Sequence, residues 1–229
     1  MKPPIIVFDL DGTLVDTAPD LLDAMNHALT KAGFEPVHDE GFRENVSLGA
    51  RVMLERARQG AGRPATPGEL DAMMVDFLDH YRANMPGRSR PYESVLDAID
   101  TFLRDDFLVA VCTNKTEEMA MRLLKALEID TLFSAVCGQD TFPVRKPDPG
   151  HLFGTIDKAG GDRRRAVMIG DSETDIRTAQ AARIPVVAVD FGYTDKHVGE
   201  FAPDRVISHY SALDLDLVAE LLARHSAAG

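Results

Sequence analysis

Short apolar runs alternate with longer amphipathic stretches over most of this 229-residue chain. The first run, Ile5–Phe8, contains no polar position and is rich in β-branched residues, which is typical of a strand buried on both faces of a sheet. Similar runs predict later strands at 107–112, 135–137, 166–169, 186–189 and 205–207. Helical spacing of apolar residues lies between these runs. The alternation predicts an α/β fold, a doubly wound Rossmann-like parallel sheet with helices on both faces.

The segment from residue 17 to residue 85 has a different pattern, with helical spacing and no convincing strand. It opens with Thr17-Ala18-Pro19-Asp20, where Thr17 is suited to cap a helix. Further helices are predicted at 39–46, 49–58 and 68–85. Because one strand precedes this block and the others follow it, the block is expected to be an insertion. We therefore expect an α/β core of residues 1–15 plus 88–229, and an inserted all-helical cap domain of residues 16–87.

Polar side chains that can take part in catalysis or ligand binding follow several of the predicted strands. The ligand site of an open α/β sheet lies outside the carboxyl ends of its strands, so these side chains are expected to converge. They are Asp9 and Asp11 after the first run, Thr113 and Asn114 after the second, Asp171 and Asp175 after the run 166–169, and Lys146 in the loop before that run. Asp9 and Asp11 lie two positions apart, so they face the same way in extended backbone, and a divalent metal is the simplest partner for their charges.

This set of side chains predicts phosphoryl-transfer chemistry. A carboxylate can attack phosphorus and form an aspartyl-phosphate, and a second carboxylate can protonate the leaving oxygen and later activate water. A divalent cation offsets the repulsion between the carboxylates and the phosphate, while a hydroxyl and an ammonium bind the remaining phosphate oxygens.

Composition narrows the range of partners and compartments. The net charge of -12 and the pI of about 5.0 argue against nucleic acid as a partner. No apolar stretch is long enough for a signal peptide or a membrane span, so we expect a cytoplasmic protein without a membrane partner, either a monomer or a homodimer. Cys112 and Cys137 stand in apolar runs and are expected to be buried, reduced thiols. The seven histidines show no ligand spacing and are expected at the surface.

Four motifs occur in order along the chain: Asp9-Leu10-Asp11-Gly12-Thr13, Thr113-Asn114, Lys146-Pro147 and Gly170-Asp171-Ser172-Glu173-Thr174-Asp175. With these motifs the sequence resembles the haloacid dehalogenase superfamily, specifically its phosphatases with a helical cap inserted after the first strand. The resemblance implies that Asp9 is the nucleophile and Asp11 the general acid and base.

The same resemblance implies the ligands of metal and phosphate. The Asp9 side chain, the Asp11 backbone carbonyl and Asp171 would hold Mg²⁺, and Asp175 would orient its water shell. The phosphate would be bound by Thr113 and Lys146, with the Asn114 backbone assisting.

The substrate remains open at this level. An acid at position 11 favours phosphate esters over haloacids, and the segments 16–21, 47–51 and 113–115 are similar to bacterial phosphoglycolate phosphatases. A small phosphorylated metabolite such as 2-phosphoglycolate is therefore expected. Ser47 and Arg51 depart from that subfamily's usual glycine and acidic residue, and Arg51 could bind a substrate carboxylate or simply lie at the surface. The alternatives are a pyrophosphatase, a nucleotidase, a sugar phosphate mutase or phosphatase, and a non-catalytic phosphate-binding module.

Overall fold

The computed structural model describes residues 2–38, 40–194 and 196–228, and its contacts divide the chain into two compact units. The first, here called the α/β unit, comprises residues 1–16, 91–192 and 196–229. The second, here called the helical unit, comprises residues 17–90 together with 193–195. The first unit therefore consists of chain segments on both sides of the second.

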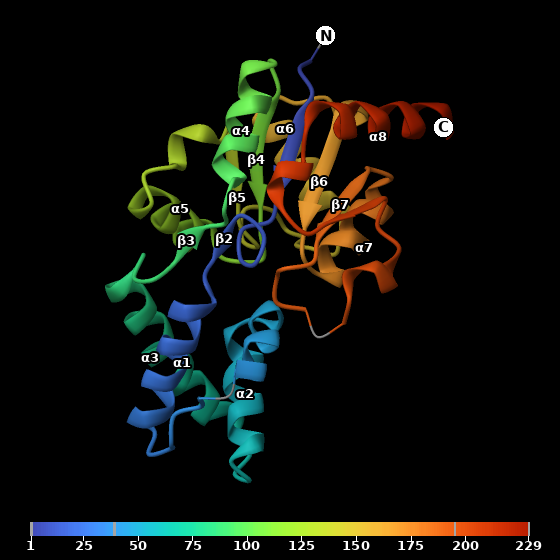
Figure 1. The fold of residues 1–229 in the computed structure, drawn as a ribbon. Helices are drawn as coiled ribbons and strands as arrows, with labels where there is room; N and C mark the ends of the chain where they lie inside the picture. Colours follow the sequence, from blue (N-terminus) through green and yellow to red (C-terminus); the bar gives the residue numbers. More distant parts are fainter. Residues whose placement is uncertain (1, 39, 195, 229) are drawn as a thin grey trace. The chain divides into compact units, whose positions relative to one another are not determined.

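A parallel sheet forms the centre of the α/β unit (Figure 1). Within the described residues it has six strands in the order β5-β4-β1-β6-β7-β8. The strands are β1 (Ile5–Phe8), β4 (Leu108–Cys112), β5 (Ala135–Cys137), β6 (Ala166–Gly170), β7 (Val186–Val189) and β8 (Arg205–Ile207). Adjacent strands pair in parallel, so the predicted strands and their parallel arrangement are confirmed. A separate pair is formed by β2 (Val15–Asp16) and β3 (Arg90–Pro91).

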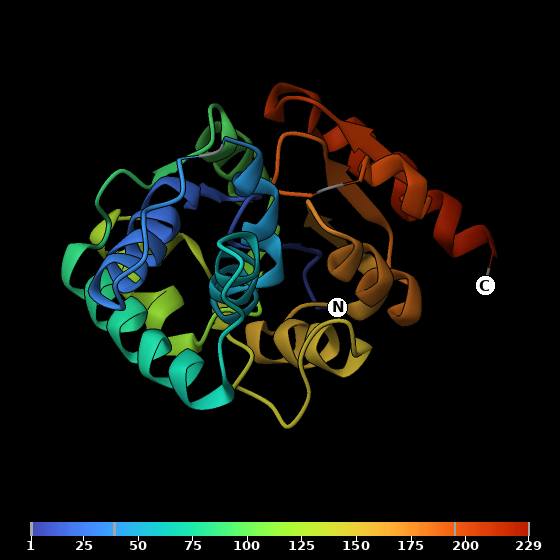
Figure 2. The ribbon, with the colours of Figure 1, turned by 90° about the horizontal axis from the view of Figure 1, so that it is seen from below.

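Helices cover both faces of this sheet. They are α4 (Val95–Arg104), α5 (Glu117–Ala126), α6 (Pro149–Ala159), α7 (Glu173–Ala182) and α8 (Leu215–Ala228). Alternate residues of β1, such as Ile5 and Val7, share a buried apolar cluster with α6 and α7. The intervening residues, Ile6 and Phe8, are equally buried on the other face, where α4 and α8 contact the sheet (Figure 2). The uninterrupted apolar strands are thus explained by burial on both faces.

The helical unit packs α1 (Ala18–Lys31) against α3 (Pro67–Asn84), with α2 (Ala50–Gly60) beside them. A 3₁₀ segment, Glu40–Leu48, stands where an α-helix was predicted at 39–46, and Asp39 lies outside the described residues. Gly41 and the β-branched Val46 both disfavour a regular α-helix, which accounts for the tighter turns. In the part of the chain that is described, no helix is long and apolar enough to cross a membrane.

The start of α1 is capped in a way that the sequence did not predict. Thr17 makes no side-chain capping hydrogen bond. Instead the buried Tyr193 hydroxyl accepts the backbone N–H groups of Thr17, at 2.6 Å, and of Ala18, at 2.9 Å. These N–H groups have no partner inside the helix, so a phenol from a distant segment of the chain satisfies them.

Candidate active site

The backbone at the end of β1 sets the position of the first two aspartates. The Asp9 N–H donates to the carbonyl of Ile169 at 2.9 Å, which extends the pairing of β1 and β6 by one residue. The chain then turns at Gly12, whose φ of 82° is in the left-handed region that favours glycine. The Gly12 N–H donates to the Val15 carbonyl at 3.0 Å and closes the turn. Asp9 therefore stands at the carboxyl edge of the sheet, where the ligand sites of such sheets lie.

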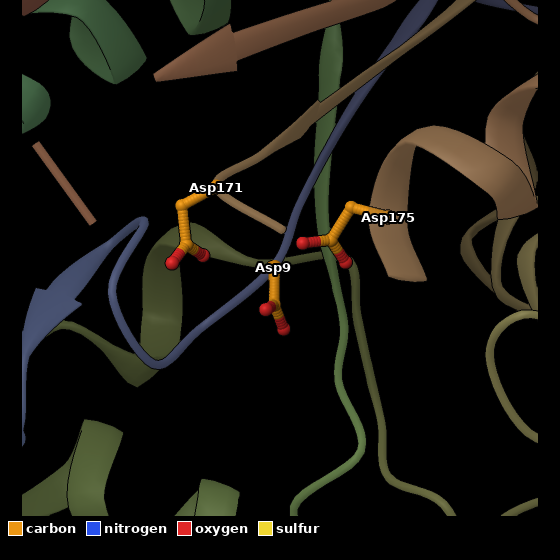
Figure 3. A group of neighbouring side chains, drawn as sticks. All are labelled: Asp9, Asp171 and Asp175. Atoms are coloured by element: carbon orange, nitrogen blue, oxygen red, sulfur yellow. The ribbon is translucent and has the colours of Figure 1, made fainter. Parts of the chain in front are cut away.

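Three carboxyl groups come together at this edge (Figure 3). Asp9, Asp171 and Asp175 each offer an oxygen, and these oxygens lie within 4.8 Å of one another. Asp171 directly follows β6, and Asp175 lies in the first turn of α7. All three residues are buried, with exposed fractions of 9%, 1% and 0%. Such a group of buried like charges requires cations to offset its repulsion.

Neighbouring polar groups fix the orientation of two of these acids. Thr13 Oγ1 donates to Asp171 Oδ1 at 2.7 Å. Ser172 and Asp175 form a reciprocal capping box, in which Asp175 Oδ2 accepts the Ser172 backbone N–H at 3.1 Å and its hydroxyl at 2.6 Å. Asp175 thus caps the helix in which it lies. A side chain at Gly192 would reach within 2.2 Å of Asp171, so the backbone can approach this acid only without a Cβ.

Lys146 supplies one cation to the acidic cluster. Its Nζ lies 2.6 Å from Asp175 Oδ1 and 2.8 Å from Asp9 Oδ1, and only 2% of the residue is exposed. Burial alone would lower the pKa of Lys146, but the carboxylates of Asp175 and Asp9 raise it, so the ammonium stays charged. The Asn114 side chain donates to the Lys146 carbonyl at 3.0 Å and ties the two predicted phosphate-binding loops together.

The charge on Asp9 is not fully offset by Lys146. Burial, followed by the negative charge of Asp175, raises the Asp9 pKa to about 7, while Lys146 acts in the opposite direction. The buried Asp9 Oδ1 has Lys146 Nζ at 2.8 Å as its ion-pair partner, and Asp175 shares that ammonium. A buried carboxylate whose charge is only partly offset would be stabilised by a further cation.

The donor set fits a divalent metal. Carboxylate oxygens are the preferred ligands of Mg²⁺ and similar hard cations, and the cluster of Asp9, Asp171 and Asp175 presents only such donors. Because Asp9 and Asp175 share the single ammonium of Lys146, negative charge remains in the cluster for a metal to offset. This acidic group can therefore bind a metal ion.

Asp11 is paired with a second lysine, Lys115, which was not among the predicted site residues. Lys115 Nζ donates to both Asp11 carboxylate oxygens, at 2.9 Å and 3.0 Å. The side chains of Lys115 and Asp11 are 9% and 21% exposed. Lys115 directly follows Thr113 and Asn114, so its position one residue beyond a strand-end motif could have indicated it.

The remaining predicted residues lie as follows. Thr113 is buried and its hydroxyl accepts the Lys115 backbone N–H at 3.2 Å. Arg51 lies in the helical unit, where it forms an exposed ion pair with Asp71 at 2.6 Å. This contact favours the interpretation of Arg51 as a surface residue. The expected burial of the two unpaired cysteines is confirmed.

The expectation that every histidine lies at the surface is wrong for His151. This residue is fully buried in α6, and its Nδ1 accepts the Lys146 backbone N–H at 3.2 Å. Burial, together with the charge of Lys146, lowers its pKa to about 4. The local sequence around this histidine did not indicate that it would be buried and bind a loop.

Protonation of His151 is expected to weaken the fold in acid. Its folded-state pKa lies below its unfolded value, so its contribution is complete above about pH 6.5 and is lost as the pH falls toward about 4. His151→Asn, which keeps an acceptor for Lys146, should reduce this acid loss by up to about 3 kcal/mol in urea unfolding followed from pH 7 to pH 4. The exposed His38→Gln is the control; an unchanged pH profile in His151→Asn would contradict the assignment.

Known proteins are similar to this chain over nearly its whole length. Residues 6–189 match the haloacid dehalogenase-like hydrolase family. A phosphoglycolate phosphatase of Mesorhizobium japonicum is 55% identical over 97% of this chain and 98% of its own length. One of Agrobacterium fabrum is 44% identical over 98% and 97% of the two chains. The crystal structure of a predicted phosphoglycolate phosphatase from Haemophilus somnus has a TM-score of 0.86 at 27% identity and covers 96% of this chain and 99% of that one.

Proposed function

Because this chain belongs to the haloacid dehalogenase-like hydrolase family, we propose that it is a phosphomonoesterase for a small phosphorylated metabolite, with 2-phosphoglycolate as the leading substrate. One observation carries the proposal: the buried group of Asp9, Asp171 and Asp175 with Lys146 inside it, next to a second carboxylate at Asp11. The relatives named phosphoglycolate phosphatase support the choice of substrate.

In the first proposed step, an Asp9 carboxylate oxygen attacks the phosphorus of the ester. The bond from phosphorus to the ester oxygen breaks, and Asp11 delivers a proton to that oxygen so that it leaves as an alcohol. Lys146 and Thr113 bind the other phosphate oxygens, with the Asn114 backbone assisting. The product is an acyl phosphate on Asp9.

In the second proposed step, Asp11 accepts a proton from water while the water oxygen attacks phosphorus. The bond between phosphorus and the Asp9 oxygen breaks, which regenerates the Asp9 carboxylate and releases inorganic phosphate. Asp11 then holds the proton that it delivers to the next leaving oxygen. A single residue therefore acts as acid and then as base, in agreement with its position two residues from the nucleophile.

Mg²⁺ is the proposed metal, held by Asp9, Asp171 and the Asp11 backbone carbonyl, with Asp175 orienting its water shell. When bound, it supplies positive charge that offsets the repulsion between the carboxylates and the incoming phosphate.

Removing metal with EDTA should abolish turnover, and added Mg²⁺ should restore it. Asp171→Asn should raise the Mg²⁺ concentration needed for half-maximal activity by more than about 10-fold. Activity that survives chelation would contradict the metal's role.

The cap domain is proposed as residues 16–87, inserted into a core of residues 1–15 plus 88–229; the helical unit, residues 17–90 together with 193–195, contains most of this cap. A cytoplasmic location is part of the same proposal, since small phosphorylated metabolites are substrates of that compartment.

A substrate panel tests the proposed activity. Purified protein with Mg²⁺ is offered 2-phosphoglycolate, a nucleoside monophosphate, pyrophosphate, glucose 1-phosphate and p-nitrophenyl phosphate, and both free phosphate and isomerised sugar phosphate are measured. We expect free phosphate, with the highest kcat/KM on 2-phosphoglycolate. A preference for pyrophosphate or a nucleotide, or isomerisation without phosphate release, would replace the proposed substrate, and no turnover of any compound would refute the phosphatase.

A further inference from the structure

The ion pair of Lys115 and Asp11 has no part in the mechanism above, although it lies within the α/β unit beside the reacting groups. Lys115 Nζ contacts both Asp11 oxygens, at 2.9 Å and 3.0 Å. Asp11 must reach the ester oxygen to protonate it, so its carboxyl group lies on the leaving-group side of the phosphate. The ammonium of Lys115 is consequently within about two hydrogen-bond lengths of the departing oxygen.

The Lys115 backbone is held firmly at this place. Its N–H donates to Thr113 Oγ1 at 3.2 Å, and its carbonyl accepts the Gln139 N–H at 2.9 Å. Thr113 is itself fixed, because its N–H donates to the Cys137 carbonyl at 3.0 Å. The Lys115 side chain is 9% exposed, so water screens its charge only weakly. Lys115 is therefore a preorganised cation in a partly desolvated position.

The charges near Asp11 indicate what such a cation would recognise. Asp9, Asp171 and Asp175 are buried acids, and Lys146 already lies between Asp175 and Asp9. A second anionic group on the leaving side of a substrate would be repelled by these acids unless a cation stood there. A lysine ammonium carries three donors on a flexible stem, so it can contact Asp11 and a substrate anion at the same time.

We propose that Lys115 is the specificity-determining residue that binds a carboxylate on the leaving group, one methylene away from the ester oxygen. This inference rests on the proposed phosphatase function and deepens it by naming the substrate class: phosphate monoesters of 2-hydroxy acids. Lys115 thus connects substrate recognition to the acid that protonates the departing oxygen.

Two matched esters test the assignment. 2-Phosphoglycolate and ethyl phosphate have the same reacting bond, and they differ in a carboxylate against a methyl group. Lys115→Met and Lys115→Gln should lower the ratio of their kcat/KM values by about 10-fold to 100-fold, mainly through a higher KM for 2-phosphoglycolate. Lys115→Arg should retain part of the preference. The exposed Lys125→Met, in α5, is the control and should leave the ratio unchanged.

The outcomes separate this inference from the function on which it rests. Equal losses on both esters in Lys115→Met and Lys115→Gln would overturn it, because Lys115 would then act on Asp11 or on the fold alone. Variants that keep the wild-type kcat/KM on both esters would overturn it as well. If the wild-type protein hydrolyses neither ester, the proposed phosphatase function itself fails and the assignment of Lys115 falls with it.

Discussion

Asp9→Asn should lower kcat by at least about 10³-fold on every phosphate ester that the wild-type protein hydrolyses. An amide is a far weaker nucleophile than a carboxylate, and it cannot form the acyl phosphate. The substitution also removes a negative charge from a buried acidic group, where burial and Asp175 already raise the Asp9 pKa to about 7. The variant should therefore be at least as stable as the wild-type protein in thermal unfolding.

Asp106→Asn is the matched control for this loss. Asp106 is exposed and has a φ of 58°, a conformation that asparagine tolerates well, so the same chemical change should leave both kcat and stability unaltered. If Asp9→Asn retained a large part of the wild-type kcat while Asp106→Asn behaved normally, Asp9 would not be the nucleophile.

Lys146→Met should be the most destabilising of the single substitutions considered for this site. It removes the cation that lies 2.6 Å from Asp175 and 2.8 Å from Asp9 and leaves both carboxylates buried without it. Loss of one partner from a buried ion pair costs about 3–5 kcal/mol, which corresponds to a fall in Tm of roughly 10 °C for a chain of this size. Activity should be lost as well, because Lys146 is a proposed phosphate ligand.

The loss of stability in Lys146→Met should depend on pH in a defined direction. The Asp9 pKa is raised to about 7 even with Lys146 present, and removing a cation that lowers it raises it further. A carboxyl group with a raised folded-state pKa loses stability as the pH rises up to that value, so both proteins lose stability alike below about pH 7. The deficit should grow from about pH 7 to about pH 9, where Asp9 is ionised in the wild-type protein and still titrating in the variant. Thermal unfolding in metal-free buffer measures it, with the exposed Lys158→Met as control. A deficit that shrinks over this range would contradict the assigned charges.

The sheet could be predicted because its strands are short, apolar and buried on both faces, and such runs leave few other choices. The Val186–Val189 and Ala166–Gly170 strands illustrate this, since neither has a polar residue. The strand ends in turn place the predicted polar residues at one edge. The parallel topology brings Asp9 and Asp171 together there, and the first turn of α7 adds Asp175.

Other features depend on contacts between distant segments and carry no local signal. Tyr193 caps α1 from a position 176 residues later in the chain, so the helix start alone suggested Thr17. His151 is buried because α6 presents it to the Lys146 loop, which no periodicity shows. The Lys115–Asp11 pair joins residues 104 positions apart, and only the folded chain shows that the two charges meet.

Trapping the covalent intermediate tests whether Asp9 is the nucleophile. The protein is mixed with 2-phosphoglycolate and Mg²⁺, quenched in acid during turnover and treated with borohydride, which reduces an aspartyl-phosphate to homoserine. Peptide mass spectrometry then locates the reduced residue. We expect substrate-dependent conversion at Asp9 alone in the wild-type protein, and none in Asp9→Asn. Conversion at Asp11 instead, or steady phosphate release with no reducible acyl phosphate in the wild-type protein, would contradict it.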